Sequence, residues 1–211
     1  MFPTISRNAL LLAAFAVVCT ACIALVSVLT KPVIAQQEQR ALLKTLNQLI
    51  PEESYDNDIY ATCFTVTDEN LLGSKEPQQV FIAKKDQDPV ALFLEASTLR
   101  GYAGEIKILV GIYKDGKVAG VRVTRHTETP GLGDKVQLSK SNWINSFTGK
   151  FYHESEAHRW EVKKNNGDFD AFTGATITPR AVTLAVKDVL IYFQDNKQQL
   201  FSHPADCGEK Q

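Results

Sequence analysis

One stretch near the N-terminus limits most strongly what this chain can fold into. From Asn8 to Thr30 it contains no Asp, Glu, Lys or Arg, and most of its side chains are apolar. A helix rises about 1.5 Å per residue, so about 20 apolar residues span a bilayer core that is about 30 Å thick. A cleaved signal peptide would have a shorter apolar core, of about 7–15 residues. The stretch therefore predicts one retained transmembrane helix over residues 9–30, after a short cytoplasmic tail of residues 1–8.

The rest of the chain has the composition of an ordinary globular domain. Its 211 residues, 44% hydrophobic and 22% charged, suffice for one domain plus an anchor. The formal net charge of -1 gives no basic excess of the kind that binds nucleic acid. Arg7 precedes the apolar stretch, whereas Lys31, Arg40 and Lys44 follow it. This Lys/Arg count mildly opposes a cytoplasmic N-terminus.

The four cysteines form two pairs with different interpretations. Cys19 and Cys22 lie in the apolar stretch, where packing as small hydrophobic side chains is favoured over a redox pair. Cys63 and Cys207 lie near the start and the end of the soluble part. A disulfide between them would tie the C-terminal tail to the domain outside the cytoplasm. Two unrelated free thiols are an equally good interpretation.

The spacing of apolar residues predicts two helices in the soluble part. Residues 36–50 have helical spacing that Pro51 stops, which predicts a connecting helix. A second, longer helix is predicted from Pro179 to about Asn196, because its apolar residues form one stripe. Residues 136–147 are mixed, with Trp143 and Phe147 at helical spacing.

Strand patterns lie between these helices. The clearest is a hairpin whose strands, residues 104–113 and 118–124, flank an Asp-Gly turn. Shorter strands are predicted at residues 59–67, 79–83 and 89–96. Strands followed by a segregated helix indicate an α+β domain, with a mainly antiparallel sheet and flanking helices. The sequence contains no G-x-G-x-x-G and no P-loop, the usual dinucleotide and phosphate motifs.

The segment from Asp170 to Arg180 is the part best suited to bind a ligand. Gly174 permits a tight turn with positive φ, and the small residues Gly174 and Ala175 let a bulky group approach the backbone. Thr178-Pro179 predicts a helix start, with Thr178 as the cap. The turn therefore brings Thr173 and Thr176 to the positive end of a helix dipole, where phosphate binds well. A capped helix after a loop, with exposed hydroxyls, is the simpler alternative.

This segment resembles the acceptor motif of flavin transferases, Asp-x-x-(Ser/Thr)-Gly-Ala-(Thr/Ser). The matching residues are Asp170, Thr173, Gly174, Ala175 and Thr176. In proteins with this motif, FMN is joined through its phosphate to the last hydroxyl residue. A second segment, Glu128-Thr129-Pro130-Gly131-Leu132-Gly133, resembles a loop of the same FMN-binding domains. The two motifs occur in the expected order, which strengthens the resemblance.

Nearly the whole chain resembles the G subunit of the Rnf-type (Rsx) electron transport complexes. The resemblance implies an electron-carrier subunit of a redox-driven ion translocase in the bacterial inner membrane, with no stand-alone catalysis. It implies an extracytoplasmic domain, iron-sulfur, flavin and membrane subunits as partners, and a flavin transferase for maturation. The implied divisions are a connecting part at residues 31–98, an FMN-binding domain at 99–196 and a C-terminal tail at 197–211. The alternatives are the C subunit of a sodium-translocating NADH:quinone reductase and a non-redox membrane-anchored adaptor.

The resemblance also implies roles for single residues. Thr176 carries FMN as a phosphodiester, Asp170 serves recognition by the transferase, and Gly174 and Ala175 give steric access. In the other loop, Gly131 and Gly133 permit close backbone approach, Leu132 packs on the flavin ring, and Thr129 or Glu128 hydrogen-bonds it. We predict no catalytic residue and no metal site, because His153 and His158 have polar surroundings without a nearby Cys.

Overall fold

The computed structural model describes residues 2–207, and the chain divides into two compact units. The first is Met1–Thr45 and the second is Leu46–Gln211. Positions 208–211 of the predicted C-terminal tail, and Met1 of the predicted N-terminal tail, lie outside the described residues.

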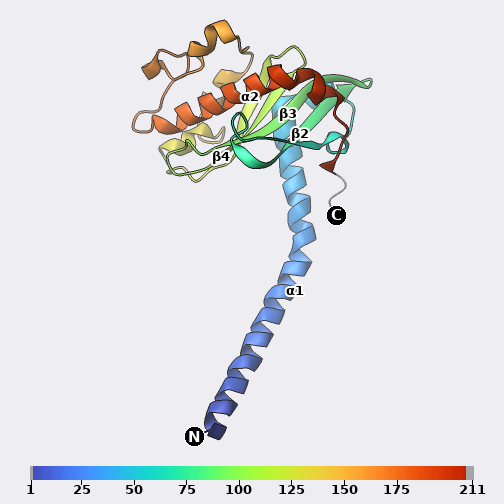
Figure 1. Ribbon diagram of the computed structural model, residues 1–211, viewed down its shortest axis with the longest axis vertical. Coiled ribbons are helices and arrows are strands. Elements are labelled where there is room, and N and C mark those ends of the chain that lie inside the picture. Colours follow the sequence, from blue (N-terminus) through green and yellow to red (C-terminus); the bar gives the residue numbers. More distant parts are fainter. Residues whose placement is uncertain (1, 208–211) are drawn as a thin grey trace. The chain divides into compact units, whose positions relative to one another are not determined.

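The first unit consists of most of one long helix, α1 (Phe2–Leu49), shown in Figure 1. It joins the predicted spans 9–30 and 36–50 without a break, although Pro32 lies inside it, and it ends before Pro51 as expected. Its large apolar side chains from Leu10 to Ile34 are all more than half exposed. In the described part of the chain it is the one helix that could cross a membrane, judged by length and composition.

The second unit is built on a five-stranded sheet. Each strand pairs antiparallel with the next one along the chain, in the order β1-β2-β3-β4-β5. The strands are β1 (Phe64–Asp68), β2 (Ser74–Lys85), β3 (Asp88–Thr98), β4 (Ile106–Tyr113) and β5 (Val118–Arg125). This confirms the predicted α+β class and the hairpin, which closes where the Lys117 N–H donates to Asp115 Oδ1 at 2.9 Å.

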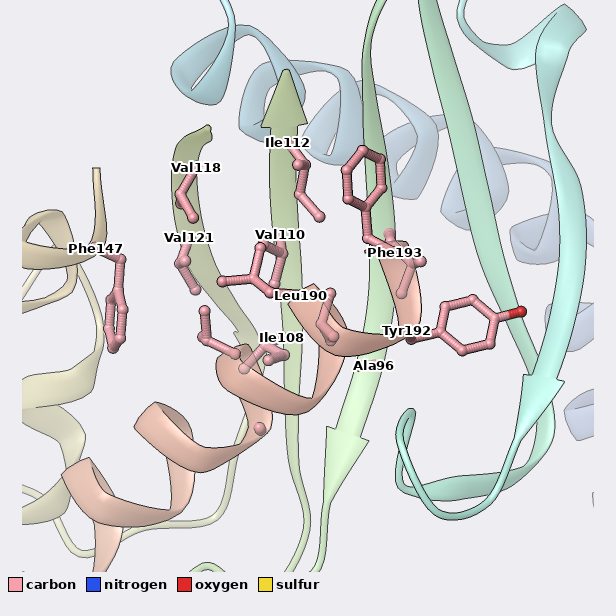
Figure 2. Close-up of a cluster of buried hydrophobic side chains, with 14 of the residues drawn as sticks. Ala96, Ile108, Val110, Ile112, Val118, Val121, Phe147, Leu190, Tyr192 and Phe193 are labelled. Carbon is pink, nitrogen blue, oxygen red and sulfur yellow. The ribbon is translucent and has the colours of Figure 1, made fainter. Parts of the chain in front are cut away.

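The helix α2 (Ile177–Ser202) lies across one face of the sheet (Figure 1). Side chains alternate between the two faces of a strand, so β4 turns Ile108, Val110 and Ile112 to the same side. Figure 2 shows them beside Leu190 of α2, in a cluster that is buried throughout. The predicted helix 179–196 is therefore correct in type and longer at both ends.

Short 3-10 helices complete the described part of the second unit. They are Glu52–Ser54, Tyr60–Thr62, Gly133–Val136, Asn142–Phe147, Glu154–Arg159 and Lys163–Asn165. The mixed residues 136–147 contain one of them, in which the rings of Trp143 and Phe147 lie 5.3 Å apart.

The predicted strand over residues 59–67 is wrong in its first half, where the chain forms the 3-10 helix Tyr60–Thr62. The cause is local hydrogen bonding. Asp58 Oδ1 accepts from the Tyr60 N–H at 3.0 Å, and Thr62 Oγ1 donates to the Ile59 carbonyl at 2.7 Å. Such side-chain bonds give the backbone an alternative to a sheet ladder.

The C-terminal tail lies against the start of β1. Cys63 and Cys207 are joined by a disulfide across a sequence separation of 144. The Asp206 and Cys207 N–H groups both donate to the Cys63 carbonyl, at 2.9 and 3.2 Å. The His203 ring stacks on Phe64 with the ring centroids 4.3 Å apart. The tail is therefore attached by covalent, hydrogen-bonded and ring contacts.

Candidate functional site

The acceptor segment forms an exposed turn that is held by hydrogen bonds and by an aromatic contact. Gly174 has φ +80°, and the Ala175 N–H donates to the Phe172 carbonyl at 3.0 Å, which closes the turn. Trp143 supports the turn, because its indole Nε1–H donates to the Asp170 carbonyl at 2.8 Å and its ring contacts Phe172. The turn is therefore held at both its start and its middle.

Thr176 lies at the N-terminal end of α2, directly before Ile177. It is exposed, and no hydrogen bond within residues 2–207 engages its hydroxyl. The first N–H groups of a helix lack partners inside it, and the helix dipole places partial positive charge there. The Thr176 hydroxyl is therefore free for chemistry at a position that favours an anion.

The prediction that Thr178 caps this helix is wrong. Thr178 is buried inside the first turn, and its hydroxyl donates to Glu128 Oε2 at 2.7 Å. The Thr178 hydroxyl is hydrogen-bonded to a side chain 50 residues away and therefore does not cap the helix. Pro179 remains in the first turn, where a missing N–H is tolerated.

The two motif segments are neighbours in space. A Cβ placed on Gly174 would lie 3.6 Å from Leu132 Cδ2. The turn at Gly131, with φ +79°, is closed by the Leu132 N–H, which donates to the Thr129 carbonyl at 3.2 Å. A Cβ on Gly131 would meet no described protein atom within 4 Å, so among the contacts inside the protein it is the positive φ of the turn that favours glycine here. Gly133 does have close neighbours, Glu128 and Thr178.

A cavity of about 560 Å³ opens between these segments. It is lined by Tyr102, Glu128, Thr129, Leu132, Gly133, Gly174, Ala175, Thr176, Ile177 and Thr178. Seven residues that were predicted to have a role at the site line it, namely Glu128, Thr129, Leu132, Gly133, Gly174, Ala175 and Thr176.

Three predicted site residues do not line the cavity. Asp170 and Thr173 are exposed on the same turn, and the Asp170 carboxylate pairs with Lys163 at 2.6 Å. Gly131 is the third, at the tip of the other loop. Asp170 is therefore presented to the outside and not to the cavity.

Three lining residues were not predicted as site residues. Thr178 was predicted only as the cap of the helix, and Tyr102 and Ile177 were given no role. Both are largely exposed, at 70% and 49%, and Leu132 beside them is exposed at 42%. Tyr102 lies in the loop between β3 and β4, between Gly101 and Gly104. An aromatic residue in such a glycine-flanked loop was the one available signal.

The cavity fits FMN in size and in the distribution of its side chains. Pockets for ligands of this class measure about 300–1,000 Å³ and are mostly apolar with a few placed polar groups. Exposed apolar side chains at Tyr102, Leu132 and Ile177 would be covered by a flat ring. The free hydroxyl of Thr176 at a helix N-terminus suits the phosphate end. The residues that line the cavity therefore suit both the flavin ring and the phosphate of FMN.

A smaller cavity is lined by residues of the segment 150–169, which precedes the acceptor turn. It measures about 200 Å³ and is lined by charged and aromatic groups, among them His153, Arg159 and Asp168. Arg159 donates to Asp168 at 3.0 Å, and Lys150 lies 3.7 Å from the same carboxylate. These ion pairs join Asp168 to Arg159 and Lys150 in the segment that leads into the acceptor turn.

The Asp168 pair predicts a contribution to stability that acid removes. The hydrogen bond from Arg159, then its charge and that of Lys150, hold the pKa of Asp168 below its ordinary value. A carboxylate whose pKa is lower in the folded than in the unfolded protein stabilises the fold above the unfolded pKa of about 3.9. This stabilisation is lost as the pH falls through the folded pKa. Asp168→Asn should therefore lower the free energy of unfolding by roughly 0.2–1 kcal/mol at pH 7. Urea denaturation from pH 7 to pH 3 should show this difference shrinking, and a difference independent of pH would contradict it.

Comparison with known proteins agrees with this geometry. Residues 101–191 match the FMN-binding domain family, and residues 1–49 match the RnfG N-terminal region. The chain is 48% identical over 201 residues, 95% of each chain, to the G subunit of the ion-translocating oxidoreductase complex of Shewanella baltica (strain OS223). It is 46% identical over 207 residues to the G subunit of the same complex from Vibrio cholerae serotype O1 (strain ATCC 39541 / Classical Ogawa 395 / O395), covering 98% and 99% of the two chains. The match to that of Aliivibrio fischeri (strain MJ11) is 42% over 210 residues, 100% of both.

These matches extend over the helix, the sheet and the cavity, and not over one motif alone. The FMN-binding match contains both cavity loops and most of α2. The N-terminal match coincides with α1. The chain therefore belongs to the family of the G subunits of ion-translocating oxidoreductase complexes, with an RnfG N-terminal region and an FMN-binding domain.

Proposed function

We propose that this chain is an electron-carrier subunit that holds FMN covalently on Thr176, within a membrane complex that couples electron transfer to ion translocation. The observation that carries the proposal is the free, exposed hydroxyl of Thr176, which lines a flavin-sized cavity at the N-terminus of α2. Bound FMN supplies one- and two-electron chemistry, and the protein supplies position and electrostatics.

The attachment is an ester between Thr176 Oγ and the flavin phosphate. The bond between Thr176 Oγ1 and phosphorus forms as the phosphoanhydride bond of a flavin dinucleotide donor breaks. The nucleoside monophosphate half of the donor leaves, and the hydroxyl proton is lost to a base of the transferase or to water. The net gain is FMN less one water. Covalent attachment suits a carrier because it cannot dissociate between electron transfers. Asp170, presented outside the cavity, is placed for contact with the transferase.

The chain itself fixes where the acceptor hydroxyl lies. Thr176 is held between the turn at Gly174 and the first turn of α2, which Thr178 ties to Glu128. Tyr102, Leu132 and Ile177 offer apolar surface to the ring. These residues bind and orient the cofactor and exclude water from one side of it.

We propose that the helix α1 anchors the subunit in the bacterial inner membrane. Its exposed apolar side chains from Leu10 to Ile34 would be covered by lipid. We propose that the soluble unit lies on the periplasmic side, where the Cys63–Cys207 disulfide can persist. The Lys/Arg count of the flanks mildly opposes this orientation. The disulfide and the family resemblance outweigh it.

The relatives are named as subunits of a complex, so we propose that this chain works with other subunits. By chemistry they are iron-sulfur and flavin proteins that exchange electrons, and membrane proteins that move the ion. No nucleic acid partner is expected from the net charge of -1.

The proposal is tested on wild-type protein that is exported and co-expressed with an active flavin transferase. The denatured protein should give a fluorescent band in a gel, because only a covalent flavin survives denaturation. A colourless protein, with transferase activity verified on a second substrate, would contradict the proposal and favour a non-redox adaptor.

Trp143 should affect the attachment through its indole N–H. Trp143→Phe keeps an aromatic ring against Phe172 but removes the donor to the Asp170 carbonyl. Loss of one such bond lowers stability by about 0.5–1.5 kcal/mol, and the looser acceptor turn should be flavinylated more slowly in a timed transferase assay.

The matched control is Trp160→Phe. Trp160 is a buried tryptophan that packs on Phe147 and Phe169, and within residues 2–207 its indole N–H makes no hydrogen bond to the acceptor turn. Equal flavinylation rates for the two variants would contradict a positioning role for Trp143.

A further inference from the structure

Glu128 is a buried carboxylate at the wall of the proposed flavin cavity. It is only 5% exposed, although it lines the cavity. Its Oε1 accepts from the Ala103 N–H at 3.1 Å, and its Oε2 accepts from the Thr178 hydroxyl at 2.7 Å. These bonds tie the loop that carries Tyr102 to the first turn of α2. Both tied segments line the cavity, so Glu128 connects two of its walls.

The chain leaves room for this carboxylate by having glycine on both sides of it. A Cβ on Gly133 would lie 2.6 Å from Glu128 Oε2, and one on Gly101 would lie 2.8 Å from Oε1. Heavy atoms cannot approach so closely without a shift. Gly133 therefore leaves the space that the carboxylate occupies. At Gly101 the turn also requires glycine, because a Cβ there would lie 2.3 Å from the Gly104 carbonyl oxygen.

The carboxylate has no ion-pair partner. No salt bridge among residues 2–207 includes Glu128, and the neighbouring His126 ring accepts from the Glu128 N–H through Nδ1. A buried carboxylate is ordinarily paired or neutralised, because burial of an isolated charge is unfavourable. Within residues 2–207 the groups that face the carboxylate are two hydrogen-bond donors, the Ala103 N–H and the Thr178 hydroxyl, and the N-terminal end of α2, and all of them suit a negative charge.

We propose that Glu128 is a positioning residue that holds the Tyr102 loop against α2 and that lowers the reduction potential of the bound flavin by its charge. The proposal rests on the proposed function. Electrons added beside a fixed negative charge are disfavoured, and the interaction is stronger in a partly desolvated cavity than in water. The positioning role operates already in the flavin-free protein, and the electrostatic role operates in the flavin-loaded protein.

Glu128→Gln separates charge from shape. The Gln carbonyl still accepts from Ala103, and its amide donates to the Thr178 hydroxyl, which both donates and accepts. Glu128→Met fills a similar volume but accepts from neither partner. A matched charge control is Asp115→Asn in the hairpin turn. Asp115 is far from the cavity. A Cβ on the adjacent Gly116 would lie 3.8 Å from Phe193, and Phe193 lies 16 residues beyond the cavity residue Ile177 in α2, which is about 24 Å along the helix.

Hydrogen exchange of the Ala103 amide in flavin-free, full-length protein tests the positioning role. We expect exchange within about twofold of wild type in Glu128→Gln, and at least about tenfold faster exchange in Glu128→Met. Equal exchange in Glu128→Met and wild type would overturn the positioning role.

Redox titration of the flavin-loaded proteins tests the charge. We expect a positive shift of the midpoint potential in Glu128→Gln and in Glu128→Met, and no shift in Asp115→Asn. A wild-type potential in Glu128→Gln would overturn the electrostatic role, while the flavin still present would leave the proposed function intact. A flavin-free wild type would overturn the electrostatic role together with the proposed function, and the exchange experiment would still decide the positioning role.

Discussion

Thr176→Ala should abolish covalent flavin attachment completely. The two nearby hydroxyls cannot replace that of Thr176. Thr173 lies on the same turn but does not line the cavity, and Thr178 is buried with its hydroxyl donated to Glu128. The fold should be unaffected, because Thr176 is exposed and makes no cap hydrogen bond. Flavin fluorescence of the denatured protein and its intact mass measure the loss.

Thr176→Ser is the matched control for this change. It keeps a hydroxyl at the same position before α2, and the acceptor motif accepts either residue at its last position. It should carry a covalent flavin, while Thr176→Ala carries none under the same transferase activity. Attachment that persists in Thr176→Ala would show that another residue is the acceptor.

Removal of the disulfide should be the largest stability change among these predictions. In the chain-entropy account, a cross-link over a sequence separation of 144 stabilises by about 5 kcal/mol, and loss of native disulfides commonly costs about 2–5 kcal/mol. The double variant Cys63→Ser, Cys207→Ser should therefore lose roughly 2–5 kcal/mol in denaturation of the exported protein. The expected first effect is release of the tail from β1.

The control for the disulfide is the other cysteine pair. Cys19→Ser, Cys22→Ser changes two free thiols in α1, within the first unit, and should leave unfolding of the second unit unchanged. Reducing agent should lower the free energy of unfolding of wild type by the same amount as the double substitution does. Equal stability of the oxidised wild type and the Cys63, Cys207 variant would contradict a structural role for the bond.

The parts of the fold that local sequence determines were predicted well. The β4–β5 hairpin follows from alternating side chains and an Asp-Gly turn, all within 20 residues. The helix α2 follows from one apolar stripe. In both cases the signal and the element it forms lie in the same short segment. The 3-10 helix at Tyr60–Thr62 was missed because two polar side chains compete with the ladder there.

The cavity was predicted only in part because three distant segments form it. As expected from the resemblance, both motif loops supply lining residues, which are Glu128, Thr129, Leu132 and Gly133 from one and Gly174, Ala175 and Thr176 from the other. Tyr102 reaches the cavity because the β3–β4 pairing brings its loop there, and no local pattern encodes that placement. Thr178 was assigned as a cap for the same reason, since its partner Glu128 lies 50 residues away.

Peptide mapping of the flavin-loaded wild-type protein tests whether Thr176 carries the flavin. Cleavage after Lys164 and Arg180 releases one peptide that contains Thr173, Thr176 and Thr178. We expect this peptide to gain the mass of FMN less one water, and fragment ions to place the gain on Thr176. A gain on Thr173 or Thr178, or on another peptide, would contradict the assignment of Thr176 as the flavin carrier.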